Sequence, residues 1–296
     1  MPYNIKGNVS FLSNQEKYNT EKPFYSNNGV VFDREHASPH NVQSEYIELE
    51  VEDIRGREEE GGEMNDNLDR WPFQIIKHTS QHLDWDRLEN FDNYRKETEQ
   101  LLTTKFNAVK AVCFDVLIRS SEPVEKRTEE YGLDDPRRPN VPALITHNDL
   151  SHDASLNIMA DHLTEDELKE YCNGKYRVRM MNMWRPLVDK VETRPLAMCD
   201  PQTVEEKDVV RCDRLAGEWL SEIYVYKYNP NMKWYWLSDQ ARDEVWIFVF
   251  WDSEANMAKS RSCPHTSIED PRFVGPDAPI RRSVETRNFV IERVRV

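Results

Sequence analysis

Long apolar runs and paired cysteines are both missing from this sequence of 296 residues. No stretch of about 18 consecutive apolar residues occurs, which argues against a transmembrane helix. The first residues also lack the basic and then apolar pattern of a secretory signal. The five cysteines are scattered and show no C-x-x-C spacing. We therefore expect reduced thiols and a cytoplasmic location.

Positive charge is scarce as well. The 39 lysines and arginines stand against 54 aspartates and glutamates, which gives a formal net charge of −15. Such a charge argues against nucleic acid and anionic membrane surfaces as partners, and a small molecule is the expected partner. Eight tryptophans and twelve tyrosines indicate a packed globular protein. Whether the chain forms a homo-oligomer is left open.

The chain is predicted to form a single domain over residues 1–296. Residues 1–70 are polar and acidic and are expected to be an N-terminal extension, with a surface loop at 57–63 and candidate strands at 29–32 and 46–51. The core of the domain is expected at 108–294. These boundaries follow from the change in composition along the chain.

Helical and alternating patterns predict the elements of that core. Apolar residues recur on one face from Asp86 to Phe106, which predicts a helix. Thr164 to Glu167 forms a capping box that starts a short helix, ended by Asn173-Gly174. Strands are predicted at 108–118, 143–146, 176–184, 223–228, 245–251, 262–268 and 283–294. Helices early and strands late predict a mainly β fold, an antiparallel double-sheet barrel with flanking helices.

An H-x-D motif, His147 and Asp149, follows the apolar run 143–146. Two residues apart in an extended strand, both side chains project from one face and reach one metal ion. Together with a second histidine they complete the 2-His-1-carboxylate triad, which leaves part of an iron(II) ion open for reactants. A turn-prone surface loop is the alternative interpretation of the same residues.

His265 is the candidate for the third ligand. It lies 116 positions after Asp149 (265 − 149), far enough for another strand of the same barrel to deliver it. A polar histidine at the mouth of the barrel is the alternative. His152 lacks the one-residue spacer and is not expected to bind the metal. His78 and His82, without the glutamate of a zinc protease between them, are expected to be structural or surface residues.

The last predicted strand offers arginines for a carboxylate ligand. A guanidinium fork pairs bidentately with carboxylates, including those of a 2-oxo acid. Alternation places Arg281, Ser283, Glu285 and Arg287 on one face, and Arg282 on the other. Arg281 with Ser283, or Arg287, is therefore the candidate co-substrate site. A structural ion pair between Glu285 and Arg287 is the alternative.

These residues belong to blocks that resemble the fungal and bacterial hydroxylase/desaturase family of secondary metabolism. That family includes gibberellin A4 desaturase-like and cephalosporin 7α-methoxylase-like proteins. The matching blocks follow the family order over about residues 108–292, and they are His147–Asp149, Asn182–Leu187, Pro195–Asp200, Tyr226–Pro230, Trp234–Trp236, Asp243–Val245, Pro264–Thr266 and Arg281–Arg287. The N-x-W-R-P-L and P-H-T blocks are far more specific than H-x-D alone.

The resemblance implies a double-stranded β-helix (jelly-roll, cupin-like) oxygenase core that uses Fe(II), 2-oxoglutarate and O₂. It implies that His147, Asp149 and His265 bind the metal. It assigns 2-oxoglutarate to the arginines of the final strand.

The resemblance also marks candidate residues of the substrate pocket. Asn182, Trp184 and Arg185 lie in a matching block, which implies a weaker role at the pocket. Leu150 stands where the family usually has glutamine after the H-x-D motif, so we expect it to reshape the substrate pocket.

The implied reaction is oxidation of an unactivated C–H bond of a small, amino-acid-derived substrate, by hydroxylation or desaturation, with release of succinate and CO₂. Oxidative cyclisation of an amino acid, including C–N bond formation, is the alternative with the same cofactors. A metal-free β-barrel binding protein is the alternative without catalysis. Iron binding separates the last of these from the other two.

Overall fold

The protein is built around two β-sheets in a computed structural model that describes residues 2–26, 40–59, 62, 64–65, 67–123, 131–132, 135–216, 219–254 and 262–294. In spatial order the nine-stranded sheet contains β1 (Ile5–Leu12), β3 (Ser44–Asp53), β11 (Trp234–Trp236), β8 (Leu196–Cys199), β13 (His265–Ser267), β6 (His147–Asn148), β10 (Trp219–Tyr226), β9 (Val209–Ala216) and β2 (Phe24–Ser26). The five-stranded sheet contains β4 (Phe73–Lys77), β12 (Glu244–Asp252), β7 (Tyr176–Pro186), β14 (Arg282–Arg293) and β5 (Lys110–Ser120).

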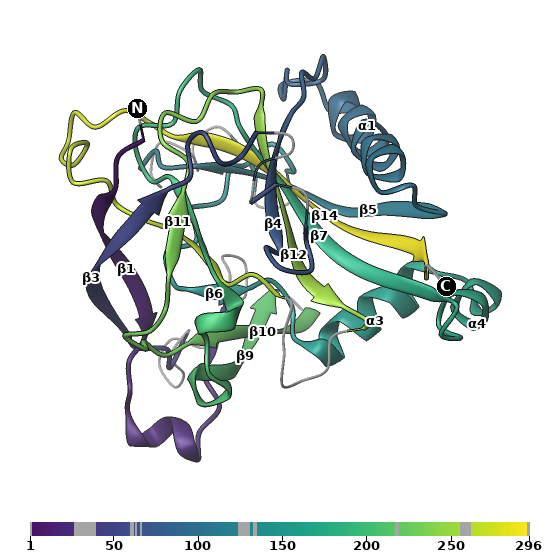
Figure 1. Cartoon of the computed structure of the whole chain (residues 1–296), viewed down its shortest axis with the longest axis horizontal. Coiled ribbons are helices and arrows are strands. Elements are labelled where there is room, and N and C mark those ends of the chain that lie inside the picture. Colours follow the sequence, from purple (N-terminus) through teal and green to yellow (C-terminus); the bar gives the residue numbers. More distant parts are fainter. Residues whose placement is uncertain are drawn as a thin grey trace.

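In the described part of the chain, three α-helices flank these sheets (Figure 1). They are α1 (Glu89–Phe106), α3 (His152–His162) and α4 (Glu165–Tyr171), and short 3-10 turns lie at Glu16–Asn19, Pro201–Thr203 and Glu206–Asp208. Helix α1 covers β5, where Phe91 and Tyr94 pack against Val116 and Ile118. Among the described residues, no helix is long and apolar enough to cross a membrane.

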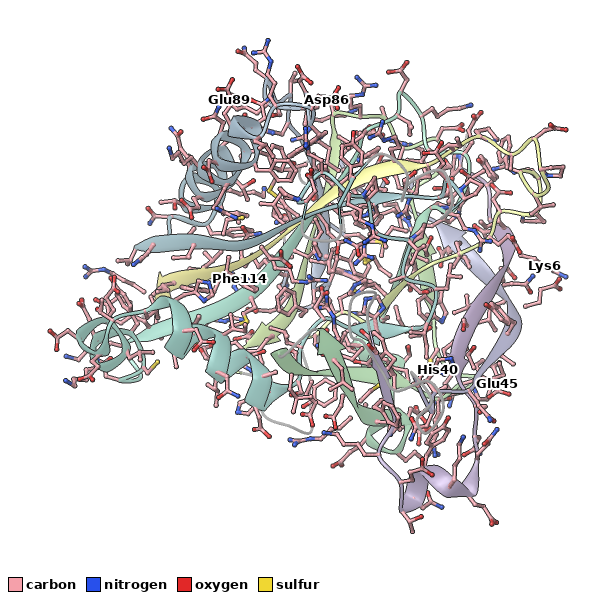
Figure 2. The ribbon with its side chains drawn as sticks, turned by 180° about the vertical axis from the view of Figure 1, so that it is seen from behind. Lys6, His40, Glu45, Asp86, Glu89 and Phe114 are labelled. Atoms are coloured by element: carbon pink, nitrogen blue, oxygen red, sulfur yellow. The ribbon has the colours of Figure 1, made fainter. Side chains whose placement is uncertain are left out.

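The side chains of β7 point alternately into the space between the two sheets and toward the outer face of the smaller sheet. It pairs with β12 on one side and with β14 on the other. Met183 packs on the outer side with Leu102 of α1, whereas Trp184 packs with Met198 of the other sheet. Side chains fill the space between the sheets (Figure 2). The predicted two-residue periodicity of this strand is therefore confirmed.

The predicted fold class, a mainly β double-sheet barrel with flanking helices, is confirmed, but the order of its elements differs. Strands β1 to β4 precede α1, so helices do not come first. The predicted extension 1–70 is instead part of the barrel, because β1, β2 and β3 belong to the larger sheet. In the predicted loop 57–63, Glu58 is buried and accepts a hydrogen bond from Arg55. The candidate strand 29–32 lies outside the described residues.

Helix α3 is an element that the sequence analysis does not predict. Ser151 caps the helix, since its side chain accepts a hydrogen bond from the backbone N–H of Ala154 at 3.2 Å. Ile158 and Met159 then bury against residues of β7 and β14. The serine cap and the following run without glycine or proline are helix signals that the sequence already contained. The capping box predicted for α4 at Thr164 is confirmed.

The two-residue strand β6 fixes the position of the H-x-D motif. The apolar run 143–146 was predicted as a strand, but the strand begins only at His147. His147 lies opposite His265 of β13 on one side and Val225 of β10 on the other. The buried Asn148 side chain donates to the carbonyl oxygens of Leu150 at 2.9 Å and Phe250 at 2.8 Å. It thereby connects β6 to β12 of the opposite sheet.

We expect Asn148→Ala to lower the free energy of unfolding by about 2 kcal/mol, because two buried carbonyl oxygens lose their donor. Denaturant unfolding followed by tryptophan fluorescence measures this change. Asn8→Ala, at an exposed position of β1, is the control and should change the value by less than about 0.5 kcal/mol. Equal stability of Asn148→Ala and wild type would contradict the anchoring role.

Candidate metal centre

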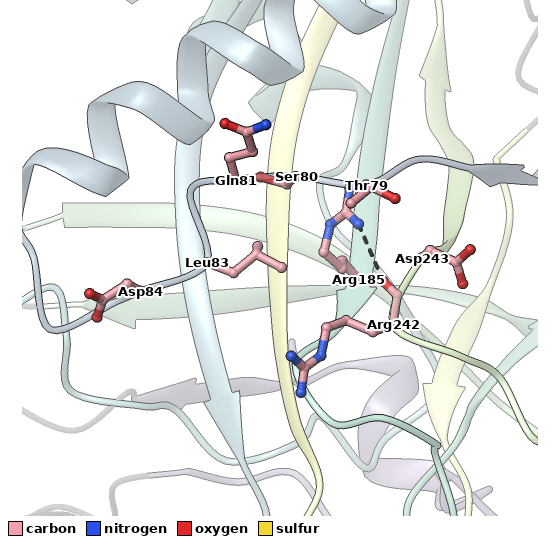
Figure 3. A pocket seen from close by; sticks show the side chains of 8 residues that line it. All are labelled: Thr79, Ser80, Gln81, Leu83, Asp84, Arg185, Arg242 and Asp243. Carbon is pink, nitrogen blue, oxygen red and sulfur yellow. Dashed lines mark hydrogen bonds between the residues drawn. The ribbon is translucent and has the colours of Figure 1, made fainter.

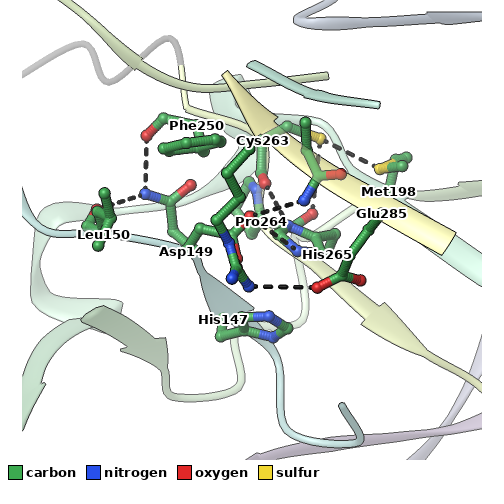
Figure 4. A network of polar contacts seen from close by, with 12 residues as sticks. His147, Asp149, Leu150, Met198, Phe250, Cys263, Pro264, His265 and Glu285 are labelled. Carbon is green, nitrogen blue, oxygen red and sulfur yellow. Dashed lines mark hydrogen bonds and ion pairs between the residues drawn. The ribbon is translucent and has the colours of Figure 1, made fainter. Parts of the chain in front are cut away.

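His147, Asp149 and His265 meet in the interior of the protein. One possible ligand atom from each lies within 4.8 Å of the other two, and all three residues are buried. The two imidazole centroids are 4.3 Å apart. Nε2 of His265 lies 3.8 Å from Oδ2 of Asp149. Figure 4 shows the three side chains converging. The structure thus brings together the three residues predicted from H-x-D and P-H-T.

Backbone carbonyl groups orient both imidazoles. Nδ1 of His147 lies 2.8 Å from the oxygen of Ile145, and Nδ1 of His265 lies 3.1 Å from the oxygen of Cys263. Because a carbonyl oxygen only accepts, each Nδ1 carries the proton and each Nε2 keeps a free lone pair. Burial lowers the pKa of His147 to about 3 and lowers the pKa of His265 as well. Both imidazoles are therefore neutral, as metal ligands must be.

Asp149 supplies the negative charge of the triad. Burial by itself raises the pKa of Asp149, but Arg287 and the two histidines hold the pKa well below its usual range. Nε of Arg287 donates to Oδ1 at 2.8 Å. Nδ2 of Asn182 donates to Oδ2 at 3.2 Å. The carboxylate is therefore ionised at neutral pH.

This donor set fits a divalent iron ion. Two neutral imidazoles and one carboxylate are the ligands of non-haem iron(II) oxygenases. Cys263 lies two residues before His265 but does not extend the set. Burial and the neighbouring Cys199 raise the pKa of Cys263 well above its usual value, so the thiol stays protonated. Its Sγ instead lies 3.6 Å from Sδ of Met198.

Arg281 is a buried cation with open donors. Its burial, together with the charge of Arg119, lowers the pKa of Arg281 to about 9. Nη1 donates to the carbonyl oxygen of Arg194 at 2.9 Å and to Oγ of Ser267 at 3.3 Å. Nε and Nη2, like Oγ of Ser283, have no hydrogen-bond partner among the described residues. Buried donors of this kind are costly unless they meet an acceptor, which indicates a site for an anion.

Each guanidinium nitrogen of Arg287, the other predicted arginine, already has a carboxylate partner. Besides Asp149, it donates from Nη1 to Asp115 at 2.7 Å and from Nη2 to Glu285 at 3.2 Å. Arg119 in turn holds Glu285 through two contacts of 2.7 and 2.6 Å. The ion pair between Glu285 and Arg287 is therefore present. Of the two candidates, Arg281 is the one with guanidinium nitrogens that lack a partner among the described residues, beside Ser283.

Three of the predicted pocket residues lie on the interior side of the site. Asn182 contacts Asp149 directly. The Trp184 ring lies beneath Arg281, with 5.4 Å between the guanidinium carbon and the ring centroid. Leu150 packs in an apolar cluster with α3, β7 and β14. Leu150, the residue directly after Asp149, therefore places an apolar side chain next to the candidate metal ligand.

Arg185 does not contact the triad, and its role at a substrate pocket stays a prediction. It follows Trp184 in β7, and neighbouring residues of a strand point to opposite faces. Its Nε donates to Oη of Tyr94 at 3.0 Å, and Nη1 donates to the carbonyl oxygen of His78 at 2.6 Å. A separate cavity of about 460 Å³ opens beside it, lined by Thr79, Ser80, Gln81, Leu83, Asp84, Arg185, Arg242 and Asp243 (Figure 3).

Asp115 and Arg119, two charged groups of the network around Arg287, were not found from the sequence. Asp115 and Asn182 lie opposite Arg287 on its two neighbouring strands, β5 and β7. Arg119 reaches Glu285 from the same β5 strand. Only the register of the three strands brings these side chains together, and no spacing along the chain indicates it. Asn148 was missed because its role depends on a contact between the two sheets.

A family model and curated relatives match this chain. The model described as "Oxidoreductase/YMDC permease-like domain" matches residues 9–291. The hydroxylase/desaturase CTB9 of Cercospora beticola is 27% identical over 256 residues, which cover 81% of this chain and 76% of that protein. The Fe(II)/2-oxoglutarate-dependent dioxygenase nvfI of Aspergillus novofumigatus is 32% identical over 181 residues, which cover 60% of this chain and 59% of that protein.

Solved structures share the fold over nearly the whole chain. A variant of the iron and alpha-ketoglutarate-dependent endoperoxidase NvfI superposes with a TM-score of 0.80 at 23% identity, covering 98% of both chains. A structure of the unaltered NvfI gives a TM-score of 0.77 at 22% identity. These neighbours support the jelly-roll fold, and the predicted resemblance to the hydroxylase/desaturase enzymes is confirmed. Because the family model spans residues 9–291, this chain belongs to the oxidoreductase family that the model describes.

Proposed function

We propose that this chain is an Fe(II)- and 2-oxoglutarate-dependent oxygenase of secondary metabolism. It oxidises an unactivated C–H bond of a small molecule, by hydroxylation or desaturation, and releases succinate and CO₂. One observation carries this function: the triad of His147, Asp149 and His265 shares the interior with Arg281, a buried cation with open donors. The curated hydroxylase/desaturase and dioxygenase relatives support the same activity.

Each member of the triad has a defined ligand atom. Fe(II) would be held by Nε2 of His147, Nε2 of His265 and Oδ2 of Asp149. When bound, iron and 2-oxoglutarate together supply the activation of O₂ and the removal of hydrogen from the substrate. The chain itself orients the ligands through the carbonyl groups that accept from each Nδ1. It also keeps the carboxylate ionised through Arg287.

Arg281 and Ser283 are proposed to bind the distal carboxylate of 2-oxoglutarate. The open Nε and Nη2 of Arg281 form a fork that matches a carboxylate, and Oγ of Ser283 adds a third donor. Ser267 contacts the same guanidinium and belongs to β13, two residues after His265. The anion site is therefore tied directly to the strand that carries a metal ligand.

Apolar side chains around the triad exclude water from it. The Phe248 ring centroid lies 4.5 Å from that of His265. Met198 lies opposite His265 in the ladder between β8 and β13, and Trp184 packs in the same cluster. Such walls strengthen the electrostatic contacts inside the site and protect reactive species from side reactions with water.

The domain organisation, substrate class, partners and location are proposed from features of the whole chain. We treat residues 1–296 as one oxygenase domain, because strands from β1 to β14 make up the two sheets. The substrate is a small molecule, and an amino-acid-derived one is proposed. The net charge of −15 argues against nucleic acid or anionic membranes as partners. A cytoplasmic location is supported by the five cysteines, which are all free.

Removing either histidine of the triad should strongly weaken metal binding. We expect His147→Ala and His265→Ala to weaken Fe(II) affinity by more than about 100-fold, a larger loss than residues behind the ligands usually cause. Anaerobic titration with Fe(II) measures the dissociation constants. His152→Ala, which removes a nearby histidine outside the triad, should bind like wild type. If the triad variants also bind like wild type, the oxygenase assignment is wrong.

Arg281→Gln should raise the KM for 2-oxoglutarate by roughly 100-fold, because losing a buried partner of a charged group costs about 3 kcal/mol. Arg281→Lys keeps the charge but loses the fork, so an intermediate value is expected. Arg282→Gln, at the exposed neighbouring position, should leave the KM unchanged. Succinate formation at varied 2-oxoglutarate concentration gives these values. An unchanged KM in Arg281→Gln would place the co-substrate elsewhere.

Turnover tests the activity itself. With Fe(II), 2-oxoglutarate and O₂, we expect a panel of amino acids to include a compound that increases succinate release. Mass spectrometry of the product separates the gain of one oxygen from the loss of two hydrogens, as in desaturation or ring closure. A chain that binds these amino acids and never forms succinate would instead fit a binding protein.

A further inference from the structure

We infer that Arg287 and Asn182 form a carboxylate clamp that limits Asp149 to a single metal-binding oxygen, Oδ2. This inference rests on the proposed function and goes beyond it, since it gives Arg287 a positioning role in place of co-substrate binding. The two residues lie opposite each other in the ladder between β14 and β7. They approach the two oxygens of one carboxylate from the same sheet.

The two oxygens of Asp149 have different surroundings. Oδ1 lies 2.8 Å from Nε and 2.6 Å from Nη2 of Arg287, so one guanidinium places two nitrogens on it. Oδ2 lies 3.2 Å from Nδ2 of Asn182 and 3.8 Å from Nε2 of His265. Oδ1 is therefore committed to Arg287, whereas Oδ2 faces the other ligands.

The position of the guanidinium does not depend on Asp149 alone. Arg287 also contacts Asp115 at 2.7 Å and Glu285 at 3.2 Å. Three carboxylates thus surround one guanidinium, and the side chain of Arg287 is only 6% exposed. A charge held in this way is expensive to move, because the fully buried Asp149 carboxylate would lose its cationic partner. Arg287 is therefore a fixed partner for Oδ1.

This arrangement matters for the number of open positions on the metal. A six-coordinate ion with three protein ligand atoms keeps about three positions, which a chelating 2-oxo acid and O₂ would fill. If both oxygens of Asp149 bound the ion, one of those positions would be lost. By holding Oδ1, the clamp keeps that position available.

The clamp can be tested with Mn(II) alone, through the relaxation of water protons, which reports the number of exchangeable waters on the ion. We expect about three waters in wild type and about two in Arg287→Gln, because the released Oδ1 would displace one. Arg287→Lys retains a cation for Oδ1 and should restore about three. The measurement needs neither O₂ nor turnover.

Arg179→Gln is the matched control. Arg179 of β7 pairs with Glu292 of β14 through contacts of 2.7 and 2.6 Å, so it is a partly buried ion pair between the same two strands. It does not contact the triad residues. We expect Mn(II) in Arg179→Gln to carry as many exchangeable waters as in wild type. This control separates the loss of the contact with Asp149 from the general loss of an ion pair between β7 and β14.

Three results would overturn the clamp. One is an unchanged water count in Arg287→Gln with Mn(II) bound, and another is an equal decrease in Arg179→Gln. Wild type that binds no Mn(II) through the triad would overturn the proposed function as well. If Arg287→Gln does not fold, a crystal structure of the Mn(II)-loaded wild type decides. Binding through Oδ2 alone, with Arg287 on Oδ1, supports the clamp, and binding through both oxygens contradicts it.

Discussion

The ionised carboxylate of Asp149, buried beside Arg287, is the interaction on which the rest of this site depends. Burial alone would protonate the carboxyl group, and a neutral group would be a poor metal ligand. The charge of Arg287 reverses that tendency. Arg287 is in turn balanced by Asp115 and Glu285, so the interior carries opposite charges in contact. Neutral imidazoles and one carboxylate then present a site suited to a divalent ion.

The fold divides this work between its two sheets. The larger sheet supplies the ligands, with His147 on β6 directly opposite His265 on β13. The smaller sheet supplies the hydrogen-bond donors that hold the carboxylate ligand, because Asn182 of β7 and Arg287 of β14 both donate to Asp149. Anchoring β6 to the opposite sheet is therefore as important to the site as the ligands themselves. The 23% identity to NvfI at a TM-score of 0.80 shows that this fold tolerates wide sequence change.

Local patterns predicted much of this architecture, and contacts between strands account for what they missed. His147 and Asp149 were found because H-x-D spacing places two ligands on one face of a strand, and the P-H-T block added His265. The choice between Arg281 and Arg287 required strand register, since only the neighbouring strands show that Arg287 is already paired. Helix α3 was missed although its serine cap is in the sequence. Arg185 lies on the face opposite to Trp184, with Tyr94 and His78, as strand alternation requires.

We propose that the triad holds iron and that Arg281 holds the co-substrate 2-oxoglutarate beside it. A crystal structure of the protein loaded with Fe(II) and 2-oxoglutarate without oxygen tests it most directly. We expect iron on Nε2 of His147, Nε2 of His265 and Oδ2 of Asp149, with the distal carboxylate of 2-oxoglutarate on Arg281. Iron bound at any other group of residues, or 2-oxoglutarate bound away from Arg281, would contradict it.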